Sequence, residues 1–134
     1  MAQAYGIDTS ILVRLATGEP PAEFDATVAE LTRLVEREHA AVAACNMVIG
    51  EAYIALQHHY QVSKAEAKSA LASVLTSGLV APSGGQAVLD ALAAARGAGL
   101  MDRLITLQYG AAGQTTLTRD RKMANLPGGA LLAV

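Results

Sequence analysis

Short apolar runs alternate along the chain with longer segments in which apolar residues recur every three or four positions. The short runs predict strands at residues 4–7, 41–44, 79–81, 115–118 and 130–134. The longer segments predict helices at residues 11–18, 25–39, 46–60, 63–76, 87–95 and 100–109. Strands that alternate with helices indicate βαβ units with right-handed crossovers. The sequence therefore predicts one α/β domain, spanning residues 1–134, with a parallel sheet covered on both faces.

Two helix starts carry recognisable capping residues. Asn46 stands at the start of the third helix, where its side chain is expected to cap the free backbone N–H groups. Ser63 and Glu66 have the spacing of a capping box at the start of the fourth. Cys45, between an apolar strand and Asn46, is expected to be a small buried residue.

Composition excludes several classes of protein. Hydrophobic residues make up 52% of the 134 residues and charged residues 16%, which excludes general disorder. A net charge of −2 excludes a protein that binds nucleic acid by bulk positive charge, although nucleic acid remains possible as a substrate. The single cysteine excludes an internal disulfide framework and a zinc site with several cysteines.

Targeting signals are also missing from the sequence pattern. Glu51 interrupts the longest apolar segment, residues 40–56, before it reaches the roughly 18 residues needed to cross a bilayer. The first eight residues lack the basic region and apolar core of a secretory signal. We therefore expect a cytoplasmic protein that does not enter a membrane.

Four carboxylates stand in apolar sequence surroundings: Asp8, Glu51, Asp102 and Asp120. Asp8 and Asp120 follow predicted strands, and ligands of parallel sheets bind beyond the carboxyl ends of the strands. Glu51 and Asp102 lie near the starts of helices expected on the same side. Four converging acids repel one another unless a cation is bound, and oxygen ligands suit Mg²⁺ or Mn²⁺. The pattern indicates metal-assisted hydrolysis of a phosphodiester; the alternative is that these acids cap helices or pair with arginines.

The same residues resemble the motifs of PIN-domain nucleases. The order, the spacing and the chain length all agree, so the resemblance covers essentially the whole sequence. Small PIN proteins of this length are most similar to the VapC toxins of bacterial toxin–antitoxin pairs. The matching segments are residues 6–12 around Asp8, 51–56 from Glu51, 102–105 from Asp102, 118–124 around Asp120, and the closing 126–132.

This resemblance implies a three-layer α/β/α sandwich whose central parallel sheet has four to five strands, usually in the order 3-2-1-4-5. It implies an endoribonuclease dependent on Mg²⁺ or Mn²⁺ that acts on tRNA or rRNA. Asp8 and Asp102 would bind the metal directly, and Glu51 and Asp120 directly or through water. Thr118 would orient the acids, and Thr9, beside Asp8, could do the same.

Two positions depart from the family pattern. Ser10 stands where asparagine is common, which exchanges one polar capping residue for another. Arg119 stands where an apolar or aromatic residue is more usual, so it could contact an RNA phosphate or pair with Asp120. Arg121, Arg103 and Arg14 also lie near the acids in sequence, and such residues are expected to position RNA phosphates. Arg103 and Arg121 could alternatively neutralise neighbouring carboxylates.

Partners are expected on two grounds. Helices 46–60 and 63–77 carry little charge, and exposed apolar helix faces mark interfaces, so we expect a two-fold homodimer. The resemblance implies a cognate antitoxin whose C-terminal segment lies along a groove and places a basic residue near Asp8 and Asp102. The alternative function is a PIN fold without catalysis that serves as a protein-interaction module.

Overall fold

A computed structural model describes residues 3–133 as a mixed α/β fold. The helices are α1 (Thr9–Thr17), α2 (Pro21–Arg37), α3 (Asn46–His59), α4 (Lys64–Leu75), α5 (Gln86–Ala93), α6 (Leu100–Ala111) and α7 (Arg121–Ala124). The strands are β1 (Ala4–Gly6), β2 (Ala41–Ala44), β3 (Ala81–Pro82), β4 (Thr116–Thr118) and β5 (Gly129–Leu131). The order of the elements confirms the predicted alternation, and only the short α7 was not expected. The last predicted strand, 130–134, ends at a residue outside the described range.

The strands form two separate parallel sheets. The first has the order β1-β2-β3, with Tyr5 opposite Val42 and Ala43 opposite Ala81. The second consists of β4 and β5 alone, with Leu117 opposite Ala130. The predicted central sheet of four to five strands is therefore wrong for this chain, because no pairing between β1 and β4 occurs among residues 3–133. Parallel pairing and the neighbours β1–β2, β2–β3 and β4–β5 agree with the expected order.

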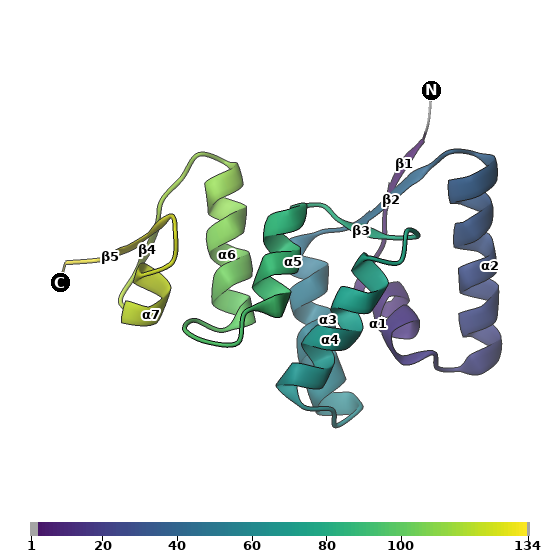
Figure 1. Cartoon of the computed structure of the whole chain (residues 1–134), viewed down its shortest axis with the longest axis horizontal. Helices are drawn as coiled ribbons and strands as arrows, with labels where there is room; N and C mark the ends of the chain where they lie inside the picture. Colours follow the sequence, from purple (N-terminus) through teal and green to yellow (C-terminus); the bar gives the residue numbers. More distant parts are fainter. Residues whose placement is uncertain (1–2, 134) are drawn as a thin grey trace.

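The two sheets lie far apart along the molecule. Figure 1 shows the β1–β2–β3 sheet toward one end, beside α2, and the β4–β5 pair at the other end, beyond α6. Helices α3, α5 and α6 stand between them in this view. We expected a single covered sheet at the centre of a three-layer sandwich. The structure instead has helices packed together between two small sheets.

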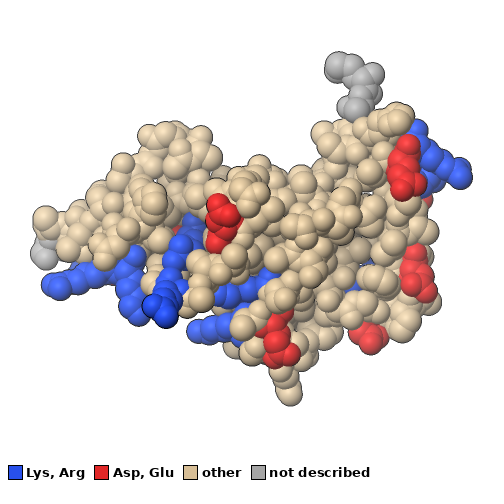
Figure 2. Space-filling model, in the orientation of Figure 1, with Lys and Arg blue, Asp and Glu red and all other residues tan. Residues whose placement is uncertain are grey.

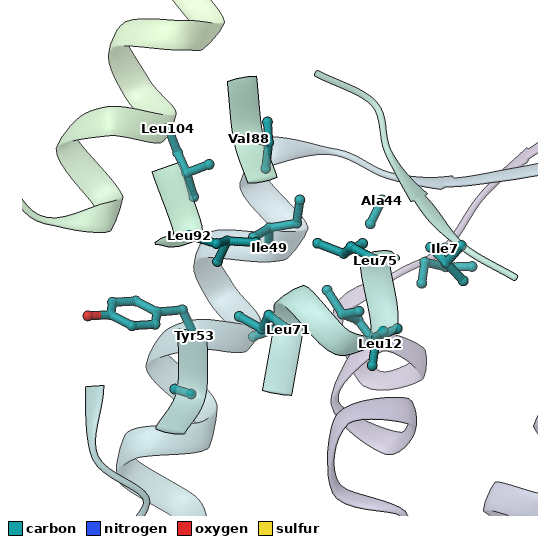
Figure 3. Packing of buried hydrophobic residues seen from close by; sticks show 14 of the residues in the cluster. Ile7, Leu12, Ala44, Ile49, Tyr53, Leu71, Leu75, Val88, Leu92 and Leu104 are labelled. Carbon is teal, nitrogen blue, oxygen red and sulfur yellow. The ribbon is translucent and has the colours of Figure 1, made fainter. Parts of the chain in front are cut away.

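The hydrophobic core lies among these helices. Helix α3 packs against α1, α4 and α6, and α5 packs against α4 and α6. Figure 3 shows Leu12, Ile49 and Leu71 meeting in this cluster, and all three are fully buried. The apolar stripes seen in the sequence thus face one another, because each helix can bury its stripe only against a neighbouring element.

Capping explains where two helices start. Ser63 Oγ accepts from the Glu66 N–H at 3.0 Å, and Glu66 Oε1 accepts from the Ser63 N–H at 3.0 Å, which confirms the capping box. The prediction for Asn46 was wrong, because Cys45 occupies the N-cap position of α3 and is exposed. The Asn46 side chain is buried and donates from Nδ2 to the Leu104 carbonyl at 3.0 Å, which ties α3 to α6.

The last elements form a local unit, β4–α7–β5. The Thr116 N–H donates to the Gly128 carbonyl, and the Leu132 N–H donates to the Thr118 carbonyl, both at 2.8 Å. Gly129 begins β5 where the chain passes very close to α7: a Cβ at this position would lie 2.4 Å from the Met123 carbonyl oxygen. This close approach requires glycine, since neither backbone segment can move aside without breaking the unit.

Gly129→Ala is therefore expected to loosen the β4–α7–β5 unit. Overpacking of this kind costs about 1–3 kcal/mol, so amide hydrogen exchange of β4 and β5 should accelerate about 5- to 150-fold. The matched control is Gly110→Ala in α6, where a Cβ would meet nothing within 4 Å. Equal exchange rates in the two variants would contradict the assigned contact with Met123.

No helix among residues 3–133 combines the length and the apolar character needed to cross a membrane.

Candidate functional site

Asp8 lies directly beyond β1 and caps α1. Its Oδ1 accepts from the Ser10 hydroxyl at 2.8 Å and from the Ile11 N–H at 3.1 Å. These donors, the Ser10 hydroxyl first, hold the pKa of Asp8 below its usual value of 3.8 because they stabilise the charged form. The carboxylate is exposed and negatively charged, with one oxygen fixed by these contacts.

Ser10→Ala is expected to raise the pKa of Asp8 toward its usual value, because it removes the largest of these contributions. Since the folded-state pKa is depressed, the stabilisation from Asp8 is present above pH 3.8 and is lost as the pH falls through the folded-state pKa. Carbon-13 NMR titration of the metal-free protein, kept in EDTA, measures this value in both forms. An unchanged pKa in Ser10→Ala would show that the hydroxyl does not act on the carboxylate.

Glu51 is joined to the first residue of α1 by a hydrogen bond. The Thr9 hydroxyl donates to Glu51 Oε1 at 3.0 Å, across 42 positions of sequence. Thr9 opens α1, and Glu51 stands in α3, which packs closely against α1. Since Thr9 directly follows Asp8 in the sequence, this bond ties Glu51 to the residue next to Asp8.

Asp102 stands in the first turn of α6, which is held against α3 at two points. One is the hydrogen bond from Asn46 to the Leu104 carbonyl. The other is at Gly50, where the end of the Met101 side chain lies so close that an added Cβ would be 2.9 Å from its sulfur. These two contacts fix the start of α6 against α3, and no described contact joins Asp102 to Glu51.

Asp120 repeats the local arrangement of Asp8 at the end of β4. Its Oδ1 accepts from the Met123 N–H at 3.1 Å and caps α7. Its own N–H donates to Thr118 Oγ1 at 3.0 Å, so Thr118 fixes the backbone that carries the carboxylate. The role of Thr118 in orienting the acids stays a prediction.

The surroundings of these carboxylates differ from the sequence-based interpretation. Asp8, Glu51 and Asp120 are exposed and Asp102 is half-buried, so none is enclosed in apolar side chains. The capping alternative is confirmed for Asp8 and Asp120. Pairing with arginine is not seen at any of the four: the ion pairs within residues 3–133 join Arg33 to Glu30 and to Glu38.

Carboxylate oxygens are ligands that Mg²⁺ and Mn²⁺ prefer. Helix capping uses one carboxylate oxygen of Asp8 and one of Asp120 and leaves the second oxygen of each for a metal ion. A metal centre also needs ligands gathered at one point. Within the described residues, no three carboxylate, histidine or cysteine side chains come close enough to hold an ion. One chain in this arrangement therefore supplies suitable ligands without assembling a complete centre.

The predicted RNA-binding arginines fall into two groups. Arg103 donates to the Ala98 and Arg96 carbonyls at 2.9 and 2.7 Å, and Arg14 donates to the Thr27 hydroxyl at 3.5 Å, so both also hold neighbouring structure. Arg119 and Arg121 are exposed, and neither forms an ion pair with a described carboxylate. Figure 2 shows basic side chains gathered along the edge of the molecule that carries α7. Contact with RNA stays a prediction for all four.

Exposed apolar side chains lie on α3 and α6. Met47 is 76% exposed and Ile54 41%, while Met101, Ile105 and Tyr109 recur along one side of α6. The expectation for α4 was wrong, since no large apolar residue of this helix is exposed. Two contacts that hold α6 against α3, Asn46 with Leu104 and Gly50 with Met101, were not predicted. Neither spacing nor composition shows which buried polar residue or glycine meets a distant helix.

No protein-family model, curated protein or solved structure matches this chain.

Proposed function

We propose that this protein is a metal-dependent endoribonuclease that hydrolyses RNA phosphodiester bonds. The observation that carries the proposal is the hydrogen bond from Thr9 to Glu51, which ties the α3 acid to the residue that follows Asp8, just beyond the carboxyl end of β1. This is the edge at which parallel α/β sheets bind ligands. The resemblance of the four acidic segments to PIN-domain motifs supports the same assignment.

The proposed metal ligands are Asp8, Glu51, Asp102 and Asp120, with Mg²⁺ or Mn²⁺ as the ion. When bound, such an ion supplies hydroxide near neutral pH and stabilises the negative charge that develops on phosphate. The contributions of the chain are positional: Ser10 and Ile11 keep Asp8 ionised and oriented, and Thr9 fixes Glu51. Thr118 fixes the backbone of Asp120.

The exposed arginines Arg119 and Arg121 would bind RNA phosphates beside Asp120. Such contacts orient the substrate without reading its bases, so the shape of the RNA would select it. This assignment agrees with a toxin that acts in the cytoplasm on a structured RNA such as tRNA or rRNA. A cognate antitoxin would cover the site, placing a basic residue near Asp8 and Asp102.

The test is cleavage of total cellular RNA, tRNA included, by the purified protein with Mn²⁺, with Mg²⁺ and with EDTA. Discrete fragments are expected with either metal and none with EDTA, because the carboxylates would have no ion to hold. The fragment ends identify the target. Intact RNA under all three conditions, together with an absence of Mn²⁺ binding by calorimetry, would favour the alternative function, a non-catalytic interaction module.

A further inference from the structure

Both small sheets have an open edge. Strand β1 pairs with β2, and no strand within residues 3–133 pairs with its other side. Strand β4 likewise pairs with β5 and, in the described part of the chain, with nothing else. An open strand edge is a row of unpaired N–H and C=O groups that is ready to accept another strand.

The unpaired groups of the two edges follow from the observed hydrogen bonds. In a strand, successive residues direct their N–H and C=O groups to opposite sides. The Ile7 N–H and the Gln3 carbonyl bond to β2, so Ala4 and Gly6 direct theirs to the open edge of β1. Thr116 and Thr118 bond to β5 and its flanking residues, so Leu117 directs its N–H and C=O to the open edge of β4.

We propose that β4 of a second copy of this chain pairs in parallel with the open edge of β1, with Leu117 opposite Tyr5. In this register the Leu117 N–H donates to the Ala4 carbonyl, and the Leu117 carbonyl accepts from the Gly6 N–H. Each chain gives its β4–α7–β5 unit to the other, which forms a closed two-fold dimer by domain exchange.

This register aligns two of the candidate ligands. Asp8 lies three residues beyond Tyr5, and Asp120 lies three residues beyond Leu117. The two carboxylates therefore leave adjacent strands at the same level, and adjacent strands are about 4.8 Å apart. Asp120 of the partner chain joins Asp8 and Glu51, which supplies the ligand that one chain does not bring to this place. This consequence, unlike the pairing itself, rests on the proposed function.

Apolar side chains support the same contact. Tyr5 is 38% exposed and Leu117 63%, and strand partners in register direct their side chains to the same face. A hollow of about 480 Å³ lies along β1, and its lining includes Tyr5, Ile7, Leu31 and Leu34. An incoming Leu117 beside Tyr5 would cover apolar surface that the single chain leaves in water.

The geometry favours a second copy over the chain's own β4. Figure 1 shows α3, α5 and α6 between the two sheets, and α6 is fixed to α3 through Asn46 and Leu104. Both β4 and α7 contact α6, so the β4–α7–β5 unit of the same chain is held on the side of α6 away from β1. Charge also agrees, because Arg119, Arg121 and Lys122 accompany the incoming strand toward Asp8 and Glu51.

A disulfide test measures the pairing without reference to activity. The chain would carry Tyr5→Cys and Leu117→Cys together with Cys45→Ser, because Cys45 is exposed and would also oxidise. Adjacent strands hold Cα atoms within the 4.4–6.8 Å range of disulfides. We expect mild oxidation to give a covalent dimer in non-reducing electrophoresis. A monomer with an internal disulfide, or free thiols, would overturn the proposal.

Two controls define the contact further. Pairing Tyr5→Cys with Leu131→Cys, on β5, should give no covalent dimer, because β5 lies on the far side of β4. Leu117→Pro removes the N–H that would bond to β1 of the second copy and that β5 does not use. Light scattering should therefore give the mass of one chain, 13.8 kDa, instead of the mass of a dimer. Leu117→Ala keeps the N–H and should remain dimeric; a monomeric wild-type protein would also refute the exchange.

A mixing experiment then connects the dimer to the proposed activity. Asp8→Asn and Asp120→Asn chains, unfolded together and refolded, would form exchanged heterodimers with one site that contains both native aspartates. About a quarter of wild-type cleavage should return, whereas without exchange no site is complete. A covalent dimer that cleaves no RNA would refute the nuclease and leave the exchange standing, so the two failures are distinguishable.

Discussion

Asp8→Asn is expected to lower metal-dependent RNA cleavage by more than about 100-fold. Mutating a group that only orients a metal ligand lowers metal affinity or activity about 10- to 100-fold. Loss of a direct ligand should therefore lower the activity further. Asparagine keeps an oxygen that can accept from the Ile11 N–H, so the cap on α1 and the fold should persist. The measurement is the rate at which each protein cleaves, at saturating Mn²⁺, an RNA that the wild-type protein cuts into discrete fragments. The ratio of the two rates gives the effect of the substitution.

The control for this variant is Asp25→Asn. Asp25 is an exposed residue of α2 that is not among the candidate ligands, so its variant should cleave at the wild-type rate. Calorimetric titration with Mn²⁺ should show weaker binding in Asp8→Asn alone. Equal cleavage by the two variants would mean that Asp8 is a helix cap and nothing more.

Leu71→Ala is expected to destabilise the fold by about 2–5 kcal/mol, the usual range for truncating a buried leucine. Leu71 is fully buried where α4 meets the rest of the core, so the variant leaves a cavity (Figure 3). Urea unfolding followed by circular dichroism measures the change in the free energy of unfolding. Both proteins must be compared at one chain concentration, because the proposed dimerisation would add to the apparent stability.

Ser69→Ala is the matched control for the core variant. Ser69 lies on the exposed side of the same helix, so its replacement should change the free energy of unfolding by less than about 0.5 kcal/mol. A Leu71→Ala protein as stable as this control would show that the core does not pack as described.

The sequence was sufficient for the local structure. Apolar spacing predicted the order of strands and six of the seven helices within residues 3–133, and the Ser63–Glu66 capping box was correct in detail. These features depend on contacts between residues a few positions apart, which a sequence displays directly. The short α7 was missed because four residues are too few for a helical repeat to be recognised.

Contacts and burial that depend on residues far apart in the sequence were predicted less well. Asn46 has the residue type of an N-cap, yet its amide is used at Leu104, 58 positions away. Cys45 was expected to be buried and is exposed, because it lies after the end of β2 as the N-cap residue of α3. Asp8 and Asp120 were chosen as candidate ligands, and the structure gives both a capping role as well.

Apolar spacing and residue types were enough to predict the alternating helices and strands and to place Asp8 and Asp120 after strands. They could not predict that β1 and β4 belong to separate sheets, each with an open edge within residues 3–133, or that α6 is fixed to α3 between these sheets. The reason is physical: periodicity states that a strand needs neighbours but carries no information on which strand, or which copy of the chain, provides them. That choice depends on how the helices pack.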